Sequence, residues 1–247
     1  MLYLGCMFKY IINLLYPALC QACGKKSESP DENICSDCLK KIKKRLPPFC
    51  TKCGKQLRGD PELQLKCSDC ENDKIYFDRA LSVCYYSGIL KDLIHNYKYK
   101  KISSLTKEFS DLAMGFIRQH DICKDIDLVL SVPMHRSRLI KREINTSHVM
   151  ARDVAKRLGV RYDTGILKKH KNTPTQSSLK RHDRIKNIRG SFCIKKAKAP
   201  ALCNKNLLLI DDLFTTGSTV NECARILKEA GCGNIDVITL ARGDIVR

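Results

Sequence analysis

Short apolar runs alternate with longer amphipathic segments from about residue 79 onward. The runs at 206–213 and 234–240 are almost continuously apolar, which is typical of strands buried on both faces of a parallel sheet. Three further strands are predicted, near residues 79–86, 127–132 and 190–194. Helices are predicted over residues 88–99, 105–120, 146–158 and 218–230. This alternation predicts an α/β domain in which helices flank a parallel sheet.

The first twenty residues are rich in apolar side chains, but Lys9 interrupts the run. The uninterrupted stretches are shorter than the roughly 18 to 20 residues that a membrane span needs, and no basic segment precedes them as in a signal peptide. We therefore expect a short apolar helix that packs on the rest of the protein, no membrane span, and a cytoplasmic location.

Eight of the fifteen cysteines form four C-x2-C pairs before residue 75: Cys20/Cys23, Cys35/Cys38, Cys50/Cys53 and Cys67/Cys70. Two residues between cysteines allow a tight turn to direct both sulfurs at one metal ion, and a glycine follows the first pair of each half (Gly24 and Gly54). The eight thiolates are sufficient for two tetrahedral zinc sites without an open position, so the zinc is expected to be structural.

The spacing leaves the grouping of the cysteines open. Sequential grouping of the first four and the last four is the simplest arrangement, and a crossed arrangement is the alternative. Disulfides or iron–sulfur ligation are alternatives to zinc, but a reducing compartment and the ribbon-like spacing favour zinc.

A second motif lies at residues 207–219, LLLIDDLFTTGST. A buried strand at 207–210 delivers Asp211 and Asp212 to the carboxyl edge of the sheet, where open α/β folds bind ligands. The next residues form a loop at the start of a helix: Thr215, Thr216, Gly217, Ser218 and Thr219. Such a loop binds a monophosphate through its backbone N–H groups. Two acids beside a monophosphate site suit a ribose 5-phosphate. A purely structural strand and capped helix would not explain the two adjacent carboxylates.

The formal net charge of +19 is concentrated in one segment. Residues 134–198 contain 19 lysines and arginines and four acids, which indicates an anion site and favours polyphosphates or nucleic acids as partners. Stacking of single-stranded bases needs exposed aromatic side chains, but there is no tryptophan and only 6% of residues are aromatic. The candidates are tyrosines such as Tyr85, Tyr86, Tyr97 and Tyr99.

The motif at 207–219 resembles the PRPP motif of the type I phosphoribosyltransferases, which has four hydrophobic positions, two acids and then T-T-G-x-T. Together with the doubled cysteine module, the whole chain resembles the ComF family, competence-associated proteins that begin with a double zinc ribbon. The resemblance implies an N-terminal helix and double zinc ribbon over residues 1–75, and a type I phosphoribosyltransferase-like domain over residues 76–247. The chain departs from the family's common P-V-P and R-G-F-N motifs, with V-P-M at 132–134 and R-E-I-N at 142–145.

The resemblance also implies roles for individual residues. Asp211 and Asp212 would hold the ribose hydroxyls, and residues 215–219 would bind the 5-phosphate. The loop with Pro133 and Met134 would approach Mg²⁺-pyrophosphate. A flexible basic lid over residues 168–189 would supply further contacts from Lys171, Gln176 and Arg184. Arg184 is counted as catalytic together with Asp211 and Asp212.

Three functions are compatible with these features. The first is a phosphoribosyltransferase or PRPP hydrolase, including a housekeeping enzyme of nucleotide or nucleoside metabolism with an unknown acceptor. The second, implied by the ComF resemblance, is binding of single-stranded DNA during natural transformation. The third is an adaptor whose zinc ribbons dock a competence helicase or another DNA-processing partner. We expect a ComF-like protein with a site for Mg²⁺-PRPP and with single-stranded DNA as its macromolecular ligand.

Overall fold

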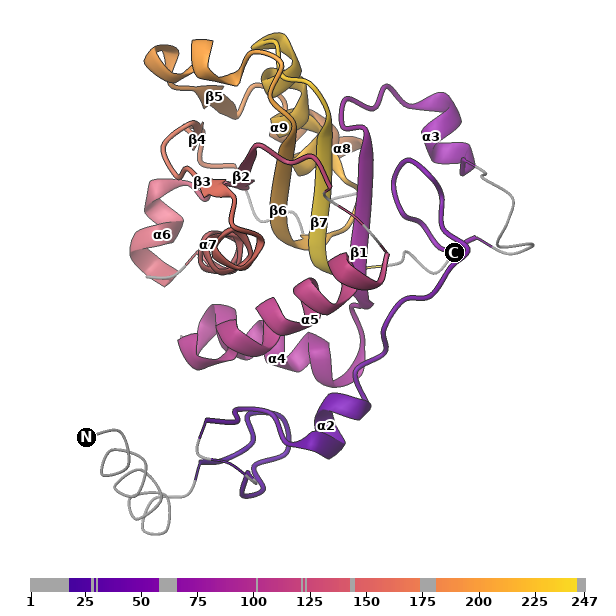
Figure 1. Ribbon diagram of the computed structural model, residues 1–247, viewed down its shortest axis with the longest axis vertical. Helices are drawn as coiled ribbons and strands as arrows, with labels where there is room; N and C mark the ends of the chain where they lie inside the picture. Colours follow the sequence, from indigo (N-terminus) through magenta and orange to yellow (C-terminus); the bar gives the residue numbers. More distant parts are fainter. Residues whose placement is uncertain are drawn as a thin grey trace.

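The main sheet contains five parallel strands in the order β1-β7-β6-β2-β3 (Figure 1). The computed structural model describes residues 18–243 other than 28, 30, 58–65, 101, 121, 123, 143–144 and 174–180. The expected apolar N-terminal helix lies outside the described residues. The strands of the sheet are β1 (Arg79–Tyr85), β2 (Leu128–Ser131), β3 (Arg161–Tyr162), β6 (Leu207–Phe214) and β7 (Ile235–Arg242). The predicted parallel α/β architecture is confirmed.

Two hydrophobic cores cover the two faces of the sheet. Successive residues of β6 alternate between them, because side chains alternate along a strand: Leu208 and Ile210 belong to one core, Leu207 and Leu209 to the other. The first core contains the buried faces of α4 (Gly88–Tyr99), α5 (Thr106–Gln119) and α7 (Thr146–Leu158). The second contains those of α9 (Ser218–Glu229) and the end of α8 (Arg181–Ile188). Double coverage explains the continuous apolar runs of β6 and β7.

Shorter elements complete the described chain. Helices α2 (Ser36–Lys40) and α3 (Ser68–Asn72) contain the last cysteine of the first and of the second cluster. Helix α6 (Arg136–Arg142) follows β2, and single 3₁₀ turns lie at Ser103–Leu105, Lys196–Lys198 and Pro200–Leu202. Among the described residues, no helix has the length and apolar character needed to cross a membrane.

One prediction about residues 190–194 is wrong. The predicted strand at 190–194 is β5 (Phe192–Ile194), but it pairs antiparallel with β4 (Leu167–Lys169) in a separate two-stranded sheet. Three residues with an exposed Cys193 at the centre do not suit a strand covered on both faces. Within the expected basic lid at 168–189, residues 181–188 form α8, which buries Ile188 in the core beside α9.

Residues 43–45, which lie between the two cysteine clusters, run along the outer edge of β1. Arg45 N–H donates to the Val83 carbonyl at 3.0 Å, and Tyr85 N–H donates to the Lys43 carbonyl at 2.9 Å. These bonds satisfy backbone groups that an edge strand would otherwise expose. The segment also separates the two clusters: cysteines of the first belong to the α4–α5 core and those of the second to the α9 core.

Substitutions at Gly24 and Gly54 test how closely the second cluster packs against the sheet. Both glycines have positive φ, +73° at Gly24 and +66° at Gly54, but a Cβ at Gly54 would lie 2.5 Å from the Ala80 carbonyl oxygen, whereas nothing lies within 4 Å at Gly24. We expect Gly24→Ala to cost about 1 kcal/mol, the penalty of a left-handed backbone. Gly54→Ala should cost about 3 kcal/mol or more, because a backbone carbonyl must also move.

Urea denaturation of the two zinc-loaded variants measures this difference. Equal losses of unfolding free energy would show that the second cluster is not rigidly seated against β1.

Candidate functional site

The eight paired cysteines form two four-sulfur clusters, one from the first four cysteines and one from the last four. Within each cluster the sulfur atoms lie within 4.8 Å of one another, which is the donor set of a closed tetrahedral zinc site. The grouping is therefore sequential, and the crossed alternative is excluded for this structure. Both clusters use the same turn, in which the glycine after the first pair donates to the carbonyl of the first cysteine at 2.8 Å (Gly24 to Cys20) and 2.9 Å (Gly54 to Cys50).

The second cluster favours thiolate at Cys50. Hydrogen bonds from the Cys53 and Cys70 thiols, and from the backbone N–H groups of Cys53 and Cys67, lower the pKa of the Cys50 thiol well below its ordinary value. Thiolate is the form that binds zinc, so the backbone around this cluster fits the ion.

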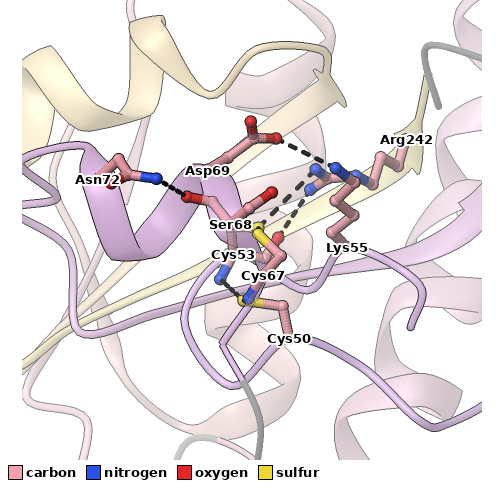
Figure 2. Close-up of polar contacts among 8 residues, drawn as sticks. All are labelled: Cys50, Cys53, Lys55, Cys67, Ser68, Asp69, Asn72 and Arg242. Atoms are coloured by element: carbon pink, nitrogen blue, oxygen red, sulfur yellow. Dashed lines mark hydrogen bonds and ion pairs between the residues drawn. The ribbon is translucent and has the colours of Figure 1, made fainter. Parts of the chain in front are cut away.

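Arg242, at the carboxyl end of β7, reaches the second cluster from the sheet, as Figure 2 shows. Its Nη1 donates to the Cys53 carbonyl at 2.7 Å, and its Nη2 lies 3.9 Å from the Cys53 Sγ. The guanidinium carbon also lies 4.4 Å from the centre of the Phe214 ring, a cation–π contact. Arg242 is buried, with 7% of its surface exposed. Its contacts with Cys53 and Phe214 link the second cluster to the end of β6.

A cavity of about 470 Å³ lies at the carboxyl edge of the sheet, and we call it the acid-pair cleft. Asp211 and Asp212 from β6 line it together with Pro133 and Met134 from the loop after β2. Asn145 supports this loop, since its side-chain amide donates to the Val132 carbonyl at 3.3 Å. The cleft thus gathers the acids and the expected pyrophosphate loop in one place.

The two acids have different partners. Asp211 Oδ1 accepts hydrogen bonds from the Ser147 hydroxyl at 2.8 Å and from the Asp212 N–H at 2.9 Å. Asp212 Oδ2 forms an ion pair with Lys98 Nζ at 2.7 Å. Withdrawal from water and the adjacent Asp212 charge raise the pKa of Asp211 to about 7. Carboxylates held at this electrostatic cost are typical of ligand sites.

Cations that surround the acids come from three separate elements. Lys98 belongs to α4, Arg138 to α6 and Lys169 to β4, and all three line the cleft. Burial and the neighbouring Arg138 lower the pKa of Lys169 to about 8. The Arg138 side chain donates to the Thr173 carbonyl, which holds the guanidinium near the opening. The sequence itself predicts no role for any of these cations, although Arg138 and Lys169 lie in the basic segment 134–198.

Residues 215–219, which we call the phosphate loop, form a wall between two cavities. Thr215 and Thr219 line the acid-pair cleft. Thr215 also lines a second cavity of about 330 Å³, together with Thr216, Gly217 and Ser218. Gly217 has φ +76°, and a Cβ there would lie 2.5 Å from the Phe214 ring, so this position requires glycine.

Of the three predicted lid residues, Lys171 is the one whose side chain the structure describes. Lys171 is exposed, and its Nζ lies beside Gly190 rather than among the residues that line either cavity. Gln176 lies outside the described residues. Arg184 lies within α8, and the structure does not describe its side chain.

Comparison with known proteins identifies both parts of the chain. Residues 11–71 match the double zinc ribbon domain, and residues 145–245 match the phosphoribosyl transferase domain. Competence protein F of Haemophilus influenzae is 26% identical over 90% of this chain and 96% of its own. The resemblance to the ComF family is confirmed. Two further ComF-like relatives agree. DNA utilization protein YhgH of Salmonella typhi is 28% identical over 93% of this chain and 99% of its own, and competence protein ComFC of Bacillus subtilis is 28% identical over 86% and 85%.

The ComF-like cysteine clusters predict the metal content. Purified protein should contain two zinc ions per chain, because each cluster supplies four sulfur ligands. Cys67→Ser should reduce the content to one, whereas Cys193→Ser, at an exposed cysteine outside both clusters, should leave two. Elemental analysis by mass spectrometry decides the matter, and folded protein without zinc would refute the assignment.

The raised pKa of Asp211 predicts a pH-dependent cost in stability. Folding favours the neutral carboxyl, so stability is greatest at acidic pH and is lost as the pH rises from the ordinary value of 3.8 through about 7. Asp211→Asn should therefore raise the melting temperature at pH 8, with a gain that shrinks toward pH 5.

Asp127→Asn is the matched control with the opposite sign. The hydrogen bond from Lys205 lowers the pKa of Asp127, so its charge contributes to stability at pH 8. If Asp211→Asn lowers the melting temperature at pH 8 as the control does, the stated environment of Asp211 is wrong.

Proposed function

We propose that this protein acts in DNA uptake, binds Mg²⁺-PRPP in the acid-pair cleft and binds single-stranded DNA along the basic surface around it. The observation that carries the proposal is that the acid pair, the loop after β2 and two residues of the phosphate loop, Thr215 and Thr219, line one cavity. The relatives, two competence proteins and a DNA utilization protein, support the DNA part.

The cleft chemistry matches the three parts of PRPP. Ribose hydroxyls would donate to Asp211 and Asp212, and the 5-phosphate would accept hydrogen bonds from the phosphate loop at the start of α9. Mg²⁺-pyrophosphate would lie toward the loop after β2. Lys98, Arg138 and Lys169 supply positive charge at this side of the cleft, which would stabilise the leaving pyrophosphate. Mg²⁺ would enter with PRPP and neutralise part of its charge.

Single-stranded DNA fits the same surroundings. The segment 134–198 supplies 19 of the chain's basic residues, and it contributes Arg138 and Lys169 to the cleft itself. Binding of a strand there would release counterions, so the affinity should fall steeply with salt. Tyr86 and the 55% exposed Tyr99 also line the cleft and offer aromatic faces for a base.

The alternative is a housekeeping phosphoribosyltransferase that transfers the sugar from PRPP to a free base. The same tyrosines favour this second function, since an acceptor base would stack beside the ribose. A time course of pyrophosphate release with candidate bases distinguishes turnover from binding alone.

The acid pair provides the test of the proposal. Asp211→Asn with Asp212→Asn should weaken Mg²⁺-PRPP binding at least about 100-fold, because each carboxylate accepts charge-assisted hydrogen bonds worth about 1.5–3 kcal/mol. Isothermal titration calorimetry measures the affinity, with Asp127→Asn as a control outside the cleft. Unchanged affinity in the double variant would eliminate the acid-pair cleft as the PRPP site.

A further inference from the structure

The second cavity shares the phosphate loop with the acid-pair cleft, but it holds no part of PRPP in the proposed function. We call it the ribbon pocket. It measures about 330 Å³ and lies between the second cysteine cluster, the phosphate loop and the start of α9. Cys53 and Cys70 form part of its wall, so both the zinc-ribbon part and the sheet contribute to it. This volume lies in the range of small-ligand pockets, about 300–1,000 Å³, and is sufficient for a nucleobase.

The ribbon pocket presents apolar and aromatic surfaces to a ligand. Ile75, Tyr76, Phe214 and Ile188 line it. Phe214 and Ile188 are almost fully buried, and Tyr76 is partly exposed. A planar aromatic ring is the ligand that such a surface recognises, because base–aromatic stacking depends on faces rather than on sequence.

Hydrogen bonds preform the wall that carries Tyr76. The Tyr76 N–H donates to the Asn221 side-chain oxygen at 2.8 Å, and the Asn221 amide donates to the Lys74 carbonyl at 3.0 Å. Asn221 belongs to the first turn of α9, directly after the phosphate loop. The position of Tyr76 is therefore set by the same helix start that shapes the loop.

The charges around the pocket suit a neutral base next to a phosphate. Three acids line the pocket: Asp69, Asp73 and Glu222. Glu222 is paired with Arg225 at 2.8 and 3.0 Å and Asp69 with Lys55 at 3.2 Å, so the charges of these two are balanced within the protein. Lys74 Nζ lies 5.3 Å from the centre of the Tyr76 ring, and the exposed Arg189 is a further cation of the lining. These cations lie where they can meet backbone phosphates.

The phosphate loop gives the two cavities a chemical connection. Thr215 lines both cavities. Thr216, Gly217 and Ser218 line the ribbon pocket, and Thr219 lines the acid-pair cleft. A sugar in the acid-pair cleft whose 5′-phosphate occupies the loop can carry a second ester bond on that phosphate. In a DNA strand this second bond leads to the preceding nucleotide, on the 5′ side.

We propose that the ribbon pocket holds the base of the penultimate nucleotide at the 3′ end of single-stranded DNA. The 3′-terminal sugar then lies at the acid pair with its free 3′-hydroxyl on a carboxylate, and its 5′-phosphate lies in the phosphate loop. This inference rests on the proposed function, because it places the strand in the same cleft as PRPP. It gives the bound strand a defined direction, with its 3′ end in the cleft, and it gives the second zinc ribbon a direct role in DNA binding.

The experiment uses fluorescently labelled oligodeoxythymidine 15-mers and the full chain with zinc bound. One oligonucleotide is intact, one is abasic at the penultimate position, and one is abasic at the tenth position from the 3′ end. Loss of the penultimate base should weaken binding about 5- to 100-fold, the effect of about 1–3 kcal/mol of stacking. The abasic site at the tenth position should have no comparable effect.

Variants at Tyr76 assign the effect to the pocket. Tyr76→Ala should weaken binding of the intact strand by a similar factor, and the penultimate abasic site should then have little further effect. Tyr76→Phe, which keeps the ring, should bind like the wild type. Zinc content and Mg²⁺-PRPP affinity should be unchanged in both variants, which shows that the fold and the acid-pair cleft are intact.

Equal affinity for the intact and penultimate-abasic strands would overturn the inference. Binding of Mg²⁺-PRPP without any binding of oligonucleotide would also overturn it and would leave the PRPP site standing. Strand binding with the predicted penultimate dependence but without PRPP binding would support the ribbon pocket while refuting the PRPP part of the proposed function.

Discussion

The contact of Arg242 with Cys53 joins the zinc-ribbon part of the chain to the ligand-binding edge of the sheet. A buried guanidinium needs nearby negative charge or acceptors, and the Cys53 carbonyl and sulfur supply them. The same guanidinium lies over the Phe214 ring, and Phe214 in turn fills the space beneath Gly217. The conformation of the phosphate loop thus depends on packing that begins at a cysteine of the second cluster.

This chain of contacts explains why the second ribbon is part of the sheet domain's own core. Its cysteines pack with Phe77 and the α9 core, and Gly54 leaves no room for a side chain against β1. The first ribbon is held by a different contact, since both nitrogens of Asn33 donate to Glu108 of α5 at 2.8 and 3.0 Å. The two similar clusters are therefore placed on opposite faces of one sheet, and only the second forms part of a cavity wall beside the phosphate loop.

Without a ligand, the acid-pair cleft holds side chains of like charge close to one another. Asp211 and Asp212 lie side by side, which raises the pKa of Asp211, while burial and Arg138 lower the pKa of Lys169. Such an arrangement lowers the stability of the free protein but prepares both signs of charge for a ligand that carries hydroxyls and phosphates. Lys98 forms an ion pair with Asp212 and so holds the second carboxylate near the position that a sugar hydroxyl would take.

Local patterns by themselves determined the four C-x2-C pairs, the parallel α/β architecture and the run from Asp211 to Thr219, because each depends on residues close together in the chain or on strand and helix periodicity. The grouping of the four pairs into two clusters came from the folded structure. Tertiary structure alone decided the rest. Ser147, Lys98 and Lys169 reach the acids from three elements distant in sequence, and no spacing rule links them. The antiparallel pairing of β4 with β5, the burial of α8 through Ile188 and the contact of Arg242 with Cys53 likewise depend on long-range packing. A sequence determines which side chains a segment offers, whereas the folded sheet determines which of them meet.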